Sequence, residues 1–360
     1  MRQRGRIMIG IGVLVVLGLA LLTTAGQGQR VPVKPEGPCT ITIDCTANAP
    51  TKATVGEVLA FSSSVSGVPG SLYATDSIVG NLRYVPAGTF TQGTPSTEVG
   101  RSWWEGPQFQ HTLTKNLAVM ETEVTRQMWA TLKAAQPTLP ADPTDTSKGS
   151  GMTNPVQRVL WYKTVLFANL LSAQQGLGTV YFADSGFVTP ITSTNSGTND
   201  VFAKWDASGY RLPTEGEWEY FIRAGTAGPF SINEPAYNEL THYPCPAAGA
   251  LAALESVAWF CANSGSASHP VGSKAANPWG LKDVYGNVEE YCWDRDEIYP
   301  DSSQTDYRGP STGDRRAYRG GSWTDSPVSV RSGWRNSILW NEPLINNLYI
   351  LGFRLLRSVN

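Results

Sequence analysis

The chain has 360 residues, a formal net charge of -2 and a charged fraction of 16%. Nucleic-acid binding requires a concentrated basic surface, so this balance excludes DNA and RNA as partners. The 36 glycines, 24 prolines and 12 tryptophans predict long stretches of turn and irregular loop, held in place by large aromatic side chains.

The first residues have the organisation of a secretory signal peptide. Three arginines precede an uncharged apolar run from Ile7 to Leu22, and small residues follow as far as Gly26. The run is shorter than the roughly 20 residues that span a bilayer comfortably, so a cleaved signal at residues 1–25 is favoured over a retained anchor. We expect no transmembrane span after cleavage and export to the periplasm, the cell surface or the medium.

Residues 26–80 are predicted to be an extension that is rich in Ser, Thr, Pro and Gly and prone to β structure. Residues 40–43 read Thr-Ile-Thr-Ile, the alternation of a short strand. The biased composition around them is also typical of partly disordered segments.

Five cysteines follow the leader, an odd number that leaves one thiol over if the others pair within the chain. Export would place them where disulfides persist. Cys39 and Cys45 can close a small loop in the extension, and two of Cys245, Cys261 and Cys292 can staple the main domain. We favour Cys261 with Cys292, although spacing alone does not determine connectivity.

Two helices are predicted in the middle of the chain. Thr125 can cap the first, because a threonine at that position accepts a backbone N–H of the first turn, and apolar residues recur after it at 3–4 spacing. The second helix covers residues 160–171. The Gly- and Thr-rich residues 173–205 are predicted to form a hairpin and a loop.

A third helix has the clearest local signals. Thr214 and Glu217 form the capping-box pattern, in which the threonine oxygen accepts an N–H three residues on and the glutamate reaches back. Gly225 stands where the helix is expected to stop. Capping and packing use these residues, so a structural role is favoured over a catalytic one for Glu215 and Glu217.

Four motifs occur in order along the chain: Tyr210–Glu219, Asn277–Glu290, Tyr318–Trp323 with its Gly-Gly-Ser, and Gly352–Arg354. Over residues 81–358 they resemble the formylglycine-generating enzyme, or sulfatase-modifying factor, family. The resemblance implies an α+β fold of the elaborated C-type-lectin-like type, irregular and loop-rich. It also implies that residues 85–90 form the strand that opens the domain.

The resemblance shows what this chain lacks. In that family the segment after Gly-Gly-Ser carries two cysteines that bind copper, and here the matching positions hold Asp325 and Val330. Soft copper(I) requires thiolates, which neither residue provides. Another branch of the family uses a three-histidine iron site from an additional helical domain, which we expect this chain not to have. We therefore expect neither copper nor iron; the histidines are His111, His242 and His269.

The resemblance also implies a structural calcium site. Asp283 and Glu290 would supply side-chain oxygens, while Gly286 and Val288 would supply main-chain carbonyls, in keeping with the oxygen ligands that calcium prefers. The alternative is an ordinary solvated acidic turn. The neighbouring Glu289 would either strengthen cation binding or face water.

The family groove supplies the remaining candidates. An arginine fork and an indole suit recognition of an extended peptide, but the two arginines could equally form buried pairs with Asp325 or Glu342. A Ser-His-Asp set of Ser322, His269 and Asp325 is disfavoured because there is no nucleophile elbow. The candidate groove residues are Ser322, Trp323, Asp325, Arg331, Trp334 and Arg335.

Three functions follow in order of preference. The first is an exported, calcium-stabilised domain that binds a peptide, a protein or a glycan in the family groove. The second is an enzyme of non-copper mechanism in the same groove, related to oxidoreductases, with Asp325 as acid or base. The third is a formylglycine-generating oxidase that acts on sulfatases. Whether the protein is an enzyme is left open.

Overall fold

A computed structural model describes residues 31–33, 41–43, 68–197, 200–232, 245–341 and 350–359. The chain divides into two units, Met1–Ser64 and Val65–Asn360. In the first unit β1 (Val31–Val33) pairs antiparallel with β2 (Ile41–Ile43), so the strand predicted at residues 40–43 is confirmed. The apolar leader, Cys39 and Cys45 lie outside the described residues. Within those residues no helix is long and apolar enough to span a bilayer.

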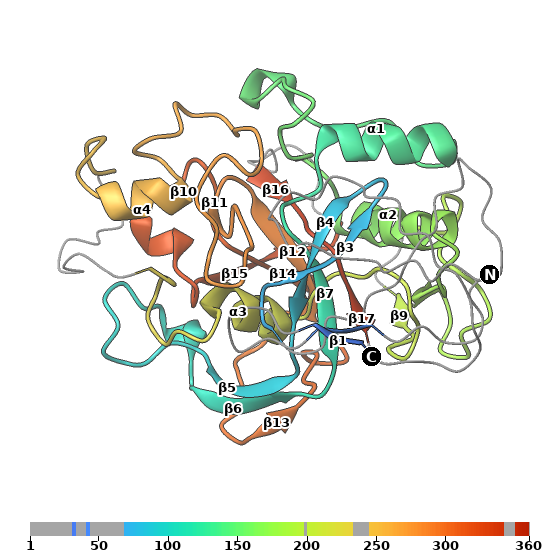
Figure 1. Ribbon diagram of the computed structural model, residues 1–360, viewed down its shortest axis with the longest axis horizontal. Helices are drawn as coiled ribbons and strands as arrows, with labels where there is room; N and C mark the ends of the chain where they lie inside the picture. Colours follow the sequence, from blue (N-terminus) through green and yellow to red (C-terminus); the bar gives the residue numbers. More distant parts are fainter. Residues whose placement is uncertain are drawn as a thin grey trace, which may run out of the picture. The chain divides into compact units, whose positions relative to one another are not determined.

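The second unit contains an antiparallel sheet in the order β17-β7-β4-β3. Its strands are β3 (Leu72–Asp76), β4 (Gly80–Val85), β7 (Asn116–Met120) and β17 (Leu356–Val359). The last strand of the chain therefore lies beside β7 and joins both ends of the unit in one sheet (Figure 1). Because β3 begins at Leu72, part of the segment 26–80 belongs to this sheet.

A second sheet has the order β13-β6-β5 and runs along the lower edge of the view in Figure 1. It comprises β5 (Gly88–Gln92), β6 (Phe109–Leu113) and β13 (Gln304–Thr305). The single opening strand expected at residues 85–90 is therefore wrong, since β4 and β5 lie in different sheets. The physical reason is Pro86, which has no N–H to donate to a strand ladder and breaks the run.

A third sheet, in the order β15-β14-β12-β16, contains Glu289, Glu290 and Arg335, and most groove candidates lie between β14 and β15. It contains β12 (Glu289–Arg295), β14 (Arg315–Arg319), β15 (Arg335–Leu339) and β16 (Leu351–Gly352). Two short pairs complete the strands: β8 (Tyr181–Phe182) with β9 (Phe202–Ala203), and β10 (Ala258–Trp259) with β11 (Tyr285–Gly286). The hairpin expected between residues 173 and 205 is the first of these pairs.

Four α-helices and three 3₁₀ turns are described. The helices are α1 (Arg126–Ala135), α2 (Trp161–Gln174), α3 (Glu215–Arg223) and α4 (Ala252–Val257). The turns are η1 (Trp103–Glu105), η2 (Thr146–Lys148) and η4 (Pro327–Val330). The predicted α+β class, with many loops, is confirmed.

Both predicted helix caps are confirmed. The Thr125 hydroxyl accepts a hydrogen bond from the Met128 N–H at 3.1 Å. The Thr214 hydroxyl accepts from the Glu217 N–H at 3.1 Å, and the Glu217 carboxylate accepts from the Thr214 N–H at 2.9 Å. After α3 the chain turns through left-handed backbone at Ala224 and Gly225, the stop expected there.

The disulfide prediction is wrong in its pairing. Cys261 pairs with Cys245, and their Cα atoms lie 6.0 Å apart. Cys292 is the free thiol of the described residues and is fully buried on β12. It lies in the apolar cluster that also contains Trp218 and Val330, so its place is set by core packing.

Candidate functional site

The segment after β14 carries the Gly-Gly-Ser motif past the start of β12. Gly320 and Gly321 have φ of 93° and 66°, which favours glycine at both positions. A Cβ on Gly321 would lie 2.5 Å from the Ser329 carbonyl oxygen, so the close approach of η4 also requires glycine. The Trp323 N–H then donates to the Asn287 carbonyl at 2.9 Å. These contacts place Ser322 next to the first residues of β12.

Asp325 holds Ser322 rather than standing free in a groove. One carboxylate oxygen accepts the Ser322 N–H at 2.8 Å and the Ser322 hydroxyl at 2.6 Å. The Asp325 carbonyl in turn accepts the N–H of Cys261 at 3.0 Å. Burial raises the pKa of the half-buried Asp325 carboxyl, while the two bonds from Ser322 oppose that rise.

Trp323, a predicted groove residue, and Val330, at one of the positions that match the family's cysteines, are parts of the core. Val330 and Trp323 are both fully buried. The Val330 side chain packs closely against Gly321: a Cβ added to Gly321 would lie 2.7 Å from it. The two positions that match the family's cysteines therefore differ in kind, since Asp325 is half-buried and Val330 is sealed from solvent.

The two arginines of the predicted groove form buried ion pairs. Arg331 contacts Glu98 at 2.5 Å and Glu105 at 2.8 Å. Arg335 makes a fork with Glu215, with N–O distances of 3.0 and 2.6 Å. The buried-pair interpretation is therefore right, but Asp325 as the partner is wrong, and Glu342 lies outside the described residues. Among the candidates Trp334 is half-buried.

The Ser-His-Asp set is not assembled. The His269 ring stacks on Trp259 with centroids 3.6 Å apart, and its Nε2 lies 2.7 Å from the Ser264 carbonyl oxygen. The His269 ring is thus held by Trp259 and Ser264, not by Ser322. His111 is buried, with its two ring nitrogens bonded to Gln92 and to the Tyr307 N–H. His242 lies outside the described residues.

Glu289 is a site residue whose role was not anticipated. It is 4% exposed, so the alternative in which it faces water is wrong. Successive residues of a strand point to opposite faces, so Glu289 and Glu290 lie on different sides of β12. One Glu289 carboxylate oxygen is buried without a hydrogen-bond partner. Burial raises the pKa of this carboxyl well above its ordinary value, and the nearby Asp325 charge raises it further.

The predicted calcium positions lie in the turn before β12 and at its start. Asp283 accepts the Gly272 N–H at 2.5 Å with one oxygen, while its other oxygen is buried without a partner. Burial raises the pKa of Asp283 to about 6, with the Glu290 charge contributing. Gly286 is required by its φ of 76° and because a Cβ would lie 1.9 Å from the Trp259 carbonyl oxygen.

Glu290 has other partners as well. It receives the Arg354 guanidinium at 2.6 Å and the Trp218 indole N–H at 2.9 Å. A third buried carboxylate, Glu123, lies close by and accepts the Val288 N–H at 3.1 Å. No sequence motif pointed to Glu123, which precedes the α1 cap and reaches this turn only in the fold.

Of the predicted calcium ligands, Asp283 is the residue with a side-chain oxygen left for a cation. Three buried carboxylates surround a single arginine, and one Asp283 oxygen is unpartnered, an arrangement that favours a cation. Both Glu290 oxygens already accept N–H groups, so Glu290 would bind through its remaining lone pairs. Among the described residues no three side chains of His, Cys, Asp or Glu converge as a metal site. A calcium ion here would depend on the Gly286 and Val288 carbonyls.

Comparison with known proteins identifies relatives of this chain. The family described as "Sulfatase-modifying factor enzyme 1-like domain" matches residues 75–359. The chain is 29% identical over 227 residues to the chaperone protein LppX of Paenibacillus barcinonensis, covering 57% of this chain and 68% of that protein. It is 34% identical over 150 residues to the formylglycine-generating enzyme of Streptomyces coelicolor, covering 37% of this chain and 42% of the enzyme.

Solved structures match over most of their length. Treponema denticola variable protein 1 has a TM-score of 0.62 and 28% identity, with 78% of this chain and 95% of that chain covered. PvdO from Pseudomonas aeruginosa has a TM-score of 0.60 and 25% identity, with 81% and 100% covered. The chain thus spans nearly all of these two structures but less than half of the formylglycine-generating enzyme that it matches.

Proposed function

The chain belongs to the sulfatase-modifying factor enzyme 1-like family, and on that premise we propose that it is an exported, calcium-stabilised domain that binds a peptide, a glycan or a partner protein. The binding surface would be the family groove around Thr324, Asp325 and Trp334, with the buried Ser322 behind Asp325. Relatives with different names share the framework, so the fold itself does not specify a reaction.

One observation carries this proposal. At the two positions where the family resemblance places copper-binding cysteines, Asp325 is bonded to Ser322 and Val330 is buried in the core. The free thiol of the described residues, Cys292, is also buried, and burial raises its pKa well above the ordinary thiol value. A thiolate pair for copper is therefore not formed by the described part of this segment.

Calcium and export belong to the same proposal. Asp283, Gly286, Val288 and Glu290 would hold the ion, whose role is to neutralise buried carboxylates and fix the turn that leads into β12. The disulfide between Cys245 and Cys261 supports an oxidising compartment.

A second function is favoured by Glu289. A buried carboxyl with an unpartnered oxygen, near a second carboxyl of raised pKa, is a combination that occurs at acid-base sites. In that case Asp325 would exchange a proton with a ligand in the groove, and Ser322 would orient its carboxylate.

The binding function is tested with the full chain on arrays of immobilised cell-envelope peptides and glycans. We expect retention of at least one of these ligand classes, weakened by Asp325→Asn and by Trp334→Ala. Lys204→Gln, an exposed lysine outside the groove, is the control and should leave retention unchanged. Retention that is unchanged in both groove variants contradicts the proposal, and so does a failure to retain any peptide or glycan on the arrays. Turnover of the retained ligand that is lost in Asp325→Asn would favour the second function.

The oxidase function has its own test. The protein is incubated with copper and a sulfatase-derived cysteine peptide, and the peptide mass is followed. We expect no aldehyde. Its formation would show that the missing cysteine pair is replaced by some other chemistry.

A further inference from the structure

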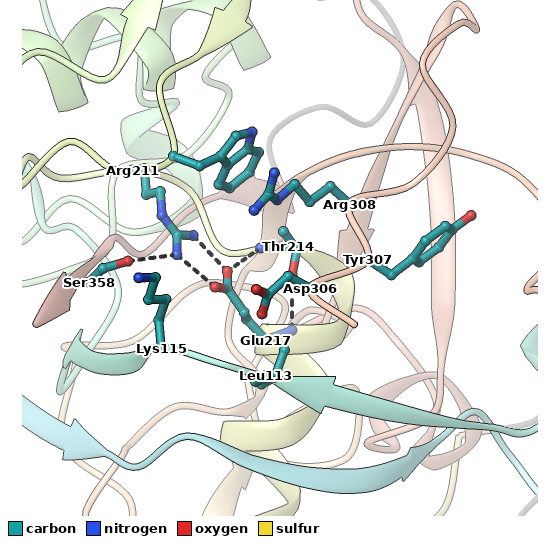
Figure 2. A pocket seen from close by; sticks show the side chains of 10 residues that line it. Leu113, Lys115, Arg211, Thr214, Glu217, Asp306, Tyr307, Arg308 and Ser358 are labelled. Atoms are coloured by element: carbon teal, nitrogen blue, oxygen red, sulfur yellow. Dashed lines mark hydrogen bonds and ion pairs between the residues drawn. The ribbon is translucent and has the colours of Figure 1, made fainter. Parts of the chain in front are cut away.

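A shallow hollow of about 30 Å³ lies away from the groove residues, and none of them lines it. Its walls come from the end of β6, the segment before α3, the first turn of α3, the stretch after β13 and β17 (Figure 2). A space of this size holds about two water-sized groups and is open to solvent, so it suits one small chemical group. Ten residues line it: Leu113, Lys115, Trp205, Arg211, Thr214, Glu217, Asp306, Tyr307, Arg308 and Ser358.

The acidic groups of this hollow are already satisfied. Glu217 accepts both terminal nitrogens of Arg211 at 2.6 Å and also the Thr214 N–H at 2.9 Å. Asp306 accepts the Thr114 N–H at 2.8 Å and the Thr114 hydroxyl at 2.5 Å. Figure 2 shows the Arg211 and Glu217 forks joined by dashed lines. The carboxylates therefore have little capacity left for a ligand's donors.

Two cations of the hollow are not satisfied in this way. Lys115 and Arg308 form no ion pair or side-chain hydrogen bond with the described residues, although both line the hollow. The Arg308 guanidinium lies over the Trp205 ring at 4.2 Å, which covers its face and leaves its N–H edge uncommitted. Partial burial lowers the pKa of Arg308, as expected for a guanidinium that is losing water.

We infer that this hollow is a binding site for a small oxyanion, a carboxylate or sulfate group, held by Lys115 and Arg308. The carboxylates of the hollow are used internally, and its two uncommitted charged groups are both N–H donors. An arginine edge offers two parallel N–H groups to such an anion, and a lysine adds a point charge. The neighbouring acids keep the site selective for small anions, because a bulky polyanion would meet Glu217 and Asp306.

The test is an NMR titration of the full, isotope-labelled chain, following the Trp205 indole N–H resonance assigned with Trp205→Phe. Sodium acetate and sodium sulfate are added separately, and sodium chloride at matched ionic strength gives the background. We expect a saturable shift with acetate or sulfate beyond the chloride background. Loss of a charged hydrogen bond should weaken binding about tenfold in Lys115→Gln and in Arg308→Gln.

Two controls make the result decisive. Lys204→Gln removes an exposed charge next to Trp205 in sequence but outside the hollow, and should leave the affinity unchanged. Arg308→Lys keeps the charge without the two parallel N–H groups and should bind with intermediate affinity. This variant also replaces Arg308→Gln in the test if the glutamine variant folds poorly. An identical response to chloride, a non-saturable shift, or equal weakening by Lys204→Gln overturns the inference. Because Asp325 takes no part, this outcome is independent of the groove function.

Discussion

The Asp325 carboxylate accepts two hydrogen bonds from Ser322, from its N–H at 2.8 Å and from its hydroxyl at 2.6 Å. This contact fixes the turn that follows Gly-Gly-Ser. Hydrogen bonds to a charged group contribute about 1.5–3 kcal/mol when shielded, and less when the group is partly exposed, as Asp325 is.

Asp325→Ala should therefore lower the free energy of unfolding by about 1–2 kcal/mol. Urea denaturation followed by circular dichroism measures the change. Thr312→Ala, at an exposed position in the loop before β14, should change stability by less than about 0.5 kcal/mol. Equal effects of the two substitutions would contradict a bracing role for the Asp325 carboxylate.

Arg335 is expected to contribute mainly to the stability of the fold, and less to ligand binding. It forms a buried fork with Glu215, and removing one partner of a buried pair leaves the other charge uncompensated. Arg335→Met should cost about 3–5 kcal/mol in the free energy of unfolding. The double variant Arg335→Met with Glu215→Leu should recover part of this loss. A stable single variant that has lost only ligand binding would show that Arg335 serves the groove instead.

Calcium should be detectable in the purified protein by elemental analysis. A ligand present at about 100 times its dissociation constant stabilises a fold by about 2.7 kcal/mol, so chelation should lower the melting temperature. Asp283→Ala removes the unpartnered oxygen and should abolish both the bound calcium and the effect of chelator. Asp325→Asn, outside this set, should keep both. Calcium-free protein with a melting temperature indifferent to chelator would rule out the site.

His111 should make stability depend on pH. Burial lowers its pKa in the folded protein, and its Nε2 accepts the Tyr307 N–H at 2.9 Å, so protonation breaks that bond. The unfolded chain then binds the proton more readily than the folded one. The stability contributed by neutral His111 is present above the ordinary histidine pKa. It is lost as the pH falls from that value to the lowered pKa of the folded protein.

Urea denaturation at neutral and mildly acidic pH measures this dependence. His111→Gln, which cannot take up a proton, should flatten the part of the profile that lies near the ordinary histidine pKa. A variant that is destabilised equally at both pH values would show that the histidine acts only through packing.

Some of this protein could be determined from its sequence. The caps of α1 and α3 depend on atoms three residues apart, Thr125 with Met128 and Thr214 with Glu217, so local rules were sufficient. The family framework was carried by four ordered motifs that need no contact information. A period of two along β12 could also have separated Glu289 from Glu290, but only once the strand's position was known.

Tertiary structure alone decided which groups meet. Arg331 and Glu105 are 226 residues apart, and Arg335 and Glu215 are 120 residues apart, so no local pattern could assign these pairs. The same holds for the pairing of Cys245 with Cys261, the burial of Val330, and the approach of Glu289 to Asp325. The physical reason is that capping and turn formation are set by neighbouring backbone groups, whereas burial and charge pairing depend on segments that the whole fold brings together.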